Sequence, residues 1–236
     1  MNRILLLLLV LSLGLGIPQV ATPLTVDFSS GTLAAQAVFE ASATNLIVTL
    51  TNTSAYDVLA PTDVLTAVFF DYDGSPLRLT AVSAVLAGGS IVLFGTTDPG
   101  NEVGGEWAYK SSLSGAPASY GISSSGLGDL FGPKDTFPGT NLQGPESPGG
   151  LEYGITSAPD DPATGNTPVT GLFALIQNSV VFTLGDLPEN FDESRITNVS
   201  FAYGTDLTAV PEPATMFLLG TGLIGIGIFV RRKFRR

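Results

Sequence analysis

The acidic side chains of this 236-residue sequence are its first candidates for catalytic chemistry. Glu102, Glu106 and Glu152 are three of its 21 acidic residues, and any two of them could supply the carboxylate pair of a glycoside hydrolase. That reaction requires the two carboxyl groups to lie within a few ångströms of each other, which depends on how the chain folds. Carboxylate-based glycoside hydrolysis is therefore one candidate function.

A second carboxylate pattern, Asp71-Tyr72-Asp73-Gly74, is compatible with calcium. Alternate carboxylates on a tight turn can converge on one ion, and oxygen atoms are the ligands that calcium prefers. The pattern departs from an EF-hand loop because glycine stands at the fourth position and no glutamate closes the loop. The alternative is a solvated hairpin turn that joins residues 65–71 to residues 77–79.

The absence of cysteine and histidine removes several other classes of site. A disulfide framework is excluded, as are Ser-His-Asp catalysis, Cys-His catalysis and the usual zinc sites. Any metal site must consist of oxygen ligands, so calcium is the one cofactor that the residue types favour.

Two aromatic residues, Trp107 and Tyr109, alternate along a predicted strand at residues 106–110. Residues two apart in a strand share a face, so these rings could form a platform on which a sugar stacks. The alternative is that the single tryptophan belongs to the hydrophobic core. Carbohydrate binding is thus a second candidate function.

The last 27 residues combine three features that must be positioned at a membrane. Pro211 and Pro213 favour an extended segment, because each fixes its own φ and restricts the preceding residue. Residues 214–230 are 17 residues without a charge, long enough for a helix of about 25 Å that can span a bilayer when flanking arginines snorkel. The basic tail that follows predicts a cytoplasmic C-terminus; its cations are Arg231, Arg232, Lys233, Arg235 and Arg236.

This order of Pro211-Glu212-Pro213, apolar helix and basic end closely resembles the PEP-CTERM sorting signal of Gram-negative bacteria. The resemblance covers about 26 residues at the C-terminal end. It implies processing near Pro-Glu-Pro by a membrane-embedded exosortase, followed by release or attachment at the cell surface or the exopolysaccharide matrix. The alternative is a plain membrane anchor after a proline-rich stalk.

The N-terminal 21 residues read as a secretory signal peptide, with Arg3 before an apolar run at residues 4–17. An uncleaved signal anchor is the alternative. The segment between signal peptide and tail, residues 22–209, contains four basic and 20 acidic residues, a formal charge of −16. Such a surface repels phosphate backbones, so nucleic-acid binding is not expected.

Residues 22–209 are predicted to form an all-β, antiparallel β-sandwich, because short strands alternate with turns and no amphipathic helix intervenes. Residues 45–52 and 65–71 give the clearest strand patterns, and residues 81–86 and 91–94 are predicted to pair around Gly88-Gly89. Further strands are predicted at residues 35–41, 179–184 and 197–203.

One long segment, residues 111–171, is rich in glycine and proline but keeps regularly placed apolar residues. A disordered linker would contain fewer of them. We therefore expect an ordered excursion laid across the sandwich, which is also the predicted binding surface, with Phe131, Phe137, Leu142, Leu151 and Ile155 packed beneath it.

Together these features predict a non-catalytic protein that the secretion machinery exports across the inner membrane. It is anchored in that membrane until an exosortase-type enzyme processes it, and it then resides at the cell surface or in the extracellular matrix, where exopolysaccharide is a possible partner. A carbohydrate-binding adhesin and a carboxylate-based glycoside hydrolase are the alternatives.

Overall fold

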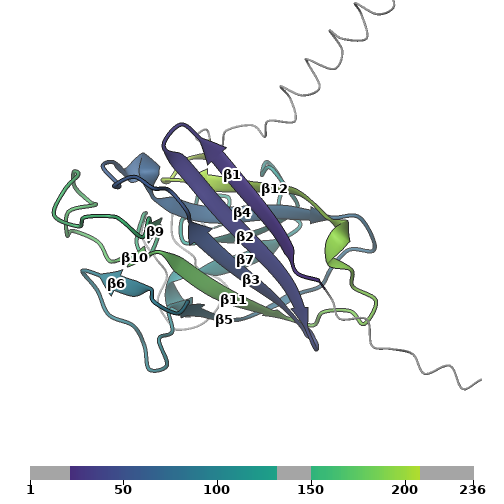
Figure 1. Ribbon diagram of the computed structural model, residues 1–236. Coiled ribbons are helices and arrows are strands. Elements are labelled where there is room, and N and C mark those ends of the chain that lie inside the picture. Colours follow the sequence, from purple (N-terminus) through teal and green to yellow (C-terminus); the bar gives the residue numbers. More distant parts are fainter. Residues whose placement is uncertain (1–21, 132–149, 208–236) are drawn as a thin grey trace, which may run out of the picture.

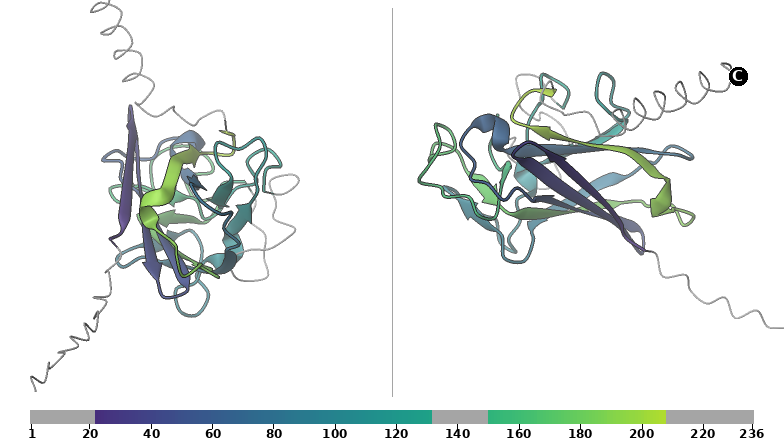
Figure 2. Two further views of the ribbon diagram at one scale, coloured as in Figure 1. Left: turned by 90° about the vertical axis from the view of Figure 1, so that its right-hand side faces the viewer. Right: turned by 45° about the horizontal axis from the view of Figure 1, so that its top comes forward.

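The computed structural model describes residues 22–131 and 150–207, which form two β-sheets packed face to face (Figure 1). The five-stranded sheet has the order β1-β2-β3-β11-β5. The seven-stranded sheet has the order β6-β10-β9-β4-β8-β7, with β12 paired to β4. Figure 2 shows the same layers from two other sides. The all-β prediction is confirmed.

The bounds of the strands are β1 Leu24–Ser30, β2 Leu33–Ser42, β3 Asn45–Asn52, β4 Leu65–Tyr72, β5 Thr80–Leu86, β6 Ile91–Leu93, β7 Ala108–Ser111, β8 Tyr120–Ser123, β9 Ile155–Thr156, β10 Leu175–Gln177, β11 Ser179–Gly185 and β12 Ile196–Tyr203. Short 3₁₀ helices occur at η1 Pro61–Asp63, η2 Gly104–Glu106 and η4 Glu193–Arg195. Within residues 22–131 and 150–207, no helix is both long enough and apolar enough to cross a membrane.

Side-chain alternation explains how the five-stranded sheet faces the core. Every second residue of β3, beginning with Leu46 and Val48, is buried, and the residues between them are only partly covered. Successive side chains of a strand point to opposite faces, so this pattern directs one apolar face inward. Antiparallel pairing with β2 and β11 extends that face across the sheet.

The central strand of the other sheet, β4, is covered on both faces. Phe70 contacts Phe39 of the opposite sheet, with ring centroids 5.3 Å apart, and thus joins the two layers. On the outer face, Phe69 lies 6.1 Å from the ring of Phe131. Apolar residues between Leu113 and Phe131 complete this outer cover. The double burial explains why residues 65–70 are all buried and, apart from Thr66, apolar.

The Gly/Pro-rich segment does more than lie across the sandwich. It contributes β8, which pairs between β4 and β7, and β9, which pairs with β4 and β10. Three residues predicted to pack beneath it, Phe131, Leu151 and Ile155, are buried. The other two, Phe137 and Leu142, lie outside the described residues.

Two predicted strand pairings were wrong. Residues 77–79 do not form a hairpin with β4, because β8, β9 and β12 occupy the edges of β4. The strands around Gly88-Gly89 do not pair either, since β5 belongs to the five-stranded sheet and β6 to the other. The strands β1, β8, β9 and β10 had no counterpart among the predicted strands, and β9 pairs with β10 in parallel.

Candidate functional site

A pocket of about 210 Å³ opens near β6 and β9. Two segments far apart in sequence form it. Residues 96–106 supply most of the lining, and Tyr153 supplies the rest. The lining residues are Thr96, Asp98, Glu102, Val103, Gly105, Glu106 and Tyr153.

Local turns bring the carboxylates of the first segment together. Gly100 and Asn101 have φ values of 91° and 62°, in the left-handed region that glycine and asparagine tolerate best. The chain reverses there, and the Asp98 amide donates to the carbonyl of Glu102 over 3.0 Å. The 3₁₀ helix η2 then places Glu106 on the same pocket. The turn at Asp98–Glu102 thus builds one wall of the pocket.

Tyr153 closes the pocket from the second segment. Its hydroxyl donates to the carbonyl of Thr96 over 2.9 Å, and its amide donates to the carbonyl of Ala174 over 2.7 Å. Burial raises the pKa of Tyr153, and the nearby charges of Glu106, Glu152 and Asp98 raise it further. The phenol therefore remains a neutral hydrogen-bond donor across the physiological pH range.

The electrostatic character of the pocket limits what it can bind. Asp98, Glu102 and Glu106 make it acidic, so it repels anions and favours cations or ligands rich in hydroxyl donors. Oε2 of Glu102 is buried and has no hydrogen-bond partner within the described part of the chain. A buried acceptor of this kind gains from a ligand that donates a hydrogen bond.

The pocket brings together some of the carboxylates considered for glycoside hydrolysis. Glu102 and Glu106 both line it. Glu152 is not part of the lining, but its charge contributes to raising the pKa of Tyr153. Sequence reasoning missed Thr96 and Tyr153 as site residues. No local signal marks Tyr153, because its place in the pocket depends on the pairing of β9 and β10 with the rest of the sheet.

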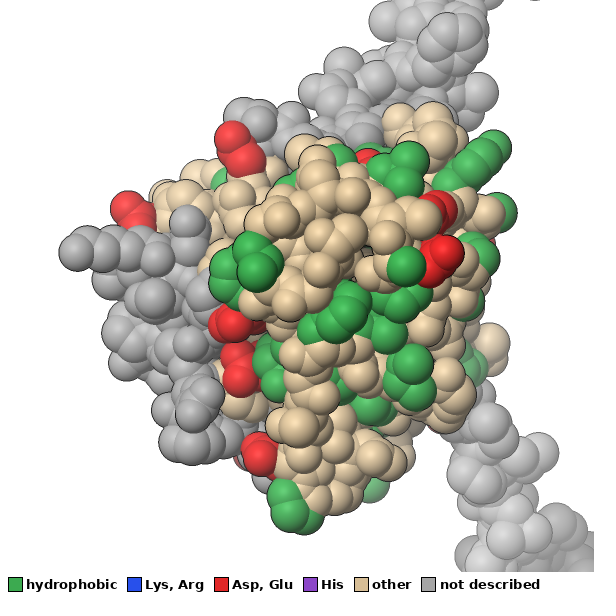
Figure 3. All heavy atoms as spheres, turned by 90° about the vertical axis from the view of Figure 1, so that its left-hand side faces the viewer, with side chains coloured by type: hydrophobic (Ala, Val, Ile, Leu, Met, Phe, Trp, Pro, Cys, Tyr) green, Lys and Arg blue, Asp and Glu red, His purple; other side chains and the backbone are tan. Residues whose placement is uncertain are grey.

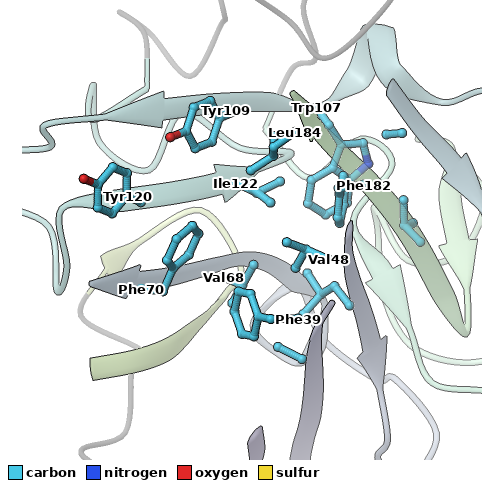
Figure 4. Packing of buried hydrophobic residues seen from close by; sticks show 14 of the residues in the cluster. Phe39, Val48, Val68, Phe70, Trp107, Tyr109, Tyr120, Ile122, Phe182 and Leu184 are labelled. Carbon is cyan, nitrogen blue, oxygen red and sulfur yellow. The ribbon is translucent and has the colours of Figure 1, made fainter. Parts of the chain in front are cut away.

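Trp107 and Tyr109 lie in the hydrophobic core, so the hypothesis that they stack on a sugar is wrong. Trp107 is fully buried, and its ring centroid lies 4.8 Å from that of Phe182 in the opposite sheet. Tyr109 is 8% exposed and points into the same core, between the layers (Figure 4). Burial raises the pKa of Tyr109, and the neighbouring Tyr120 adds to this effect.

The Asp71–Gly74 turn is organised by hydrogen bonds to protein groups. Both oxygens of Asp71 accept them, Oδ1 from the amide of Ser119 over 2.8 Å and Oδ2 from the side chain of Asn198 over 2.9 Å. Burial opposes ionisation, but these bonds outweigh it and lower the pKa of Asp71. The amide of Asp73 donates to the carbonyl of Arg195. Within residues 22–131 and 150–207, no three carboxylates gather in a way that could hold a metal ion.

A pair of aspartates, Asp57 and Asp160, joins two loops that are far apart in sequence. The Asp160 side chain accepts from the amide of Val58 over 3.0 Å, and the Asp57 side chain accepts from the amide of Asp161 over 2.8 Å. Thr164 also donates to Asp57. These reciprocal contacts bring the two carboxyl groups next to each other. Burial raises the pKa of Asp160, and Asp57 raises it further, whereas the bond from Thr164 is the main cause that lowers the pKa of Asp57.

These opposite shifts predict how substitutions of the pair act on stability. The folded protein holds the Asp160 proton more tightly than the unfolded chain does, so ionised Asp160 opposes folding at neutral pH. Asp160→Asn keeps an acceptor for Val58 and removes the charge, and it should raise the melting temperature at pH 7 by a few degrees. The gain should disappear below the ordinary carboxyl pKa of 3.8, where wild-type Asp160 is protonated in both states.

The matched control is Asp57→Asn, which should lower the melting temperature at pH 7. The pKa of Asp57 is lowered, so its ionised form favours folding above pH 3.8 and loses this effect as the pH falls through the folded-state pKa. Thermal melts monitored by circular dichroism across this range measure both variants. A lower melting temperature for Asp160→Asn at pH 7 would contradict the assignment.

The predicted sorting residues and both predicted membrane segments lie outside the described residues. Comparison with family models finds a PEP-CTERM protein-sorting motif at residues 209–236, which confirms the resemblance stated for Pro211, Glu212 and Pro213. Comparisons with curated proteins and with solved structures found no match. The motif implies an exported protein with a surface or extracellular location, processed by an exosortase-type membrane enzyme.

Proposed function

We propose that this chain, which carries a PEP-CTERM protein-sorting motif, is a non-catalytic surface or matrix protein that remains anchored in the membrane until its tail is processed. The motif at residues 209–236 is the observation that carries the proposal. The Pro-Glu-Pro segment serves as the recognition element, residues 214–230 hold the chain in the bilayer, and the basic residues at 231–236 keep that end on the cytoplasmic side.

The fold supports separate roles for the tail and for the β-sandwich. The last strand, β12, ends at Tyr203, six residues before the motif begins at residue 209. Its pairing with β4 completes the seven-stranded sheet without residues from the motif. A processing enzyme can therefore act on the tail without opening the described sandwich.

The test of the proposal is substitution within Pro-Glu-Pro. Glu212→Ala or Pro211→Ala should cause the full-length precursor to accumulate in the membrane, because the processing enzyme no longer recognises its substrate. Mass spectrometry of the C-terminus measures the outcome in the native host. A mature wild-type surface protein that still ends in Arg236 would contradict the proposal.

The chain supplies a matched control for this experiment. Pro188 and Glu189 form another Pro-Glu pair, and both residues are exposed. Glu189→Ala changes the same residue type after the same neighbour, and it should leave processing unchanged. An equal accumulation of precursor in this variant would indicate a general defect in export.

The acidic pocket favours carbohydrate binding as a second candidate function. Asp98, Glu102 and Glu106 can accept hydrogen bonds from sugar hydroxyls. A glycan array with Glu102→Gln as the comparison distinguishes binding from a purely structural role. Turnover of released exopolysaccharide would instead favour the hydrolase alternative.

A further inference from the structure

Exposed large hydrophobic side chains gather at one end of the sandwich. Tyr56, Leu59, Phe94, Leu172 and Phe173 are between 39% and 64% exposed and come from three separate segments of the chain. We call these five residues the apolar end. Figure 3 views the molecule from this end and shows hydrophobic side chains grouped together, with carboxylates around them and no Lys or Arg among the coloured atoms.

The exposure results from how these segments pack. Beneath them lies a small buried cluster whose members include Val58, Leu93, Val169 and Leu175. Tyr56 and Leu59 flank Val58, Phe94 follows Leu93, and Leu172 and Phe173 stand between Val169 and Leu175. Each segment therefore buries at least one apolar side chain in the cluster and exposes other large apolar side chains close to it in sequence.

Specific contacts hold the apolar end in place. Phe94 has a φ of 57°, an uncommon conformation for a bulky residue, and its ring lies within 3.3 Å of where a Cβ on Gly171 would stand. Ser157 donates to the carbonyl of Tyr56 over 2.6 Å, and the amide of Asn166 donates to the carbonyl of Leu59 over 3.2 Å. A bulky residue held in such a conformation at the surface is a candidate for a functional role.

The last strand brings the tail close to this end. The amide of Gly204 donates to the carbonyl of Val64, a member of the same buried cluster, over 2.8 Å. Gly204 also packs beside Pro61 and Thr62, which follow Leu59 by two and three residues. Six residues, 208–213, then separate Leu207 from the uncharged run that begins at Ala214. Six extended residues reach about 20 Å, so the anchored sandwich must stay near the bilayer.

We propose that, in the anchored protein, the apolar end rests in the interfacial region of the bilayer. Aromatic and aliphatic side chains are favourable at that depth, because apolar atoms leave water while polar neighbours stay hydrated. Carboxylates accompany this surface, because Asp63 accepts from the amide of Leu59, and Asp57, next to Tyr56, accepts from the amide of Asp161. The surface therefore suits zwitterionic better than anionic headgroups. The inference rests on the proposed membrane anchoring and adds how the exported domain is oriented before processing.

The absence of cysteine allows a direct test with the full-length chain. A polarity-sensitive fluorophore is attached to the cysteine introduced by Leu172→Cys. The matched control is the same label on the cysteine introduced by Val82→Cys. Val82 is 46% exposed and lies on β5, an edge strand of the five-stranded sheet, and not among the segments of the apolar end. In phosphatidylcholine vesicles, the probe at Leu172 should shift to the blue and be quenched by lipids that carry shallow nitroxides. The fluorophore at position 82 should show neither the blue shift nor the quenching, because it remains exposed to water.

The remaining outcomes separate this inference from the anchoring on which it depends. A chain that sediments with the vesicles but gives the same aqueous signal at both positions overturns the inference and leaves anchoring intact. A chain that does not sediment overturns both. A blue shift that grows with the protein-to-lipid ratio would mean that a second copy covers the surface instead of lipid, and that also overturns the inference. Vesicles of equal parts phosphatidylglycerol and phosphatidylcholine should give a smaller blue shift at position 172, because the anionic headgroups repel the carboxylates around the apolar end.

Discussion

Replacing Phe70 with alanine is expected to lower the free energy of unfolding by about 3–5 kcal/mol, the range for removing a buried aromatic side chain. Phe70 is fully buried, with its ring centroid 5.3 Å from those of Phe39 in the opposite sheet and Tyr120 in its own. Figure 4 shows these rings between the layers. The substitution leaves a cavity at the contact that joins the two sheets, and the surrounding strands can close it only in part.

Urea unfolding followed by tryptophan fluorescence measures this loss, since the single tryptophan, Trp107, is itself buried in the core. Phe94→Ala is the control of the same residue type. Phe94 is 50% exposed, so its removal should change stability by no more than about 0.5 kcal/mol. A loss below about 1 kcal/mol for Phe70→Ala would contradict the described packing between the sheets.

Removing residues 214–236 is expected to convert a membrane-retained chain into a freely released one. The described residues contain no helix that could span a bilayer, and the longest described strand is β2, with 10 residues. A 10-residue apolar segment is too short for a spanning helix. The sandwich should remain folded, because every strand that the structure describes ends at or before Tyr203.

Cell fractionation and limited proteolysis of this truncated chain measure release and folding together. Retention in the membrane pellet would show that the apolar run at residues 4–17 remains as a signal anchor. Release followed by rapid degradation would show that the tail has a structural role in the folded domain. Full-length protein processed in parallel serves as the reference for both measurements.

Local patterns in the sequence were enough to predict the all-β class, because the period-two alternation of residues 45–52 reports which side chains face the core. They were also enough for the sorting motif, whose three parts follow one another without any need for folding. The formal charge of −11 follows from the residue types alone.

Strand partners depended on the tertiary structure. Alternation predicts which face of a strand is buried, but it contains no information about the neighbouring strand. The run at residues 81–86 therefore gave no sign that it pairs with β11 and not with β6. The same limit applies to Trp107 and Tyr109, whose shared face could have met solvent or Phe182.

Both surfaces on which the proposals rest were likewise decided by long-range packing. The acidic pocket exists because Tyr153 reaches Thr96 across 57 residues of chain. The apolar end exists because three segments share one buried cluster, whose members range from Val58 to Leu175. No local pattern could indicate either surface, since each depends on contacts that form only after the two sheets have assembled.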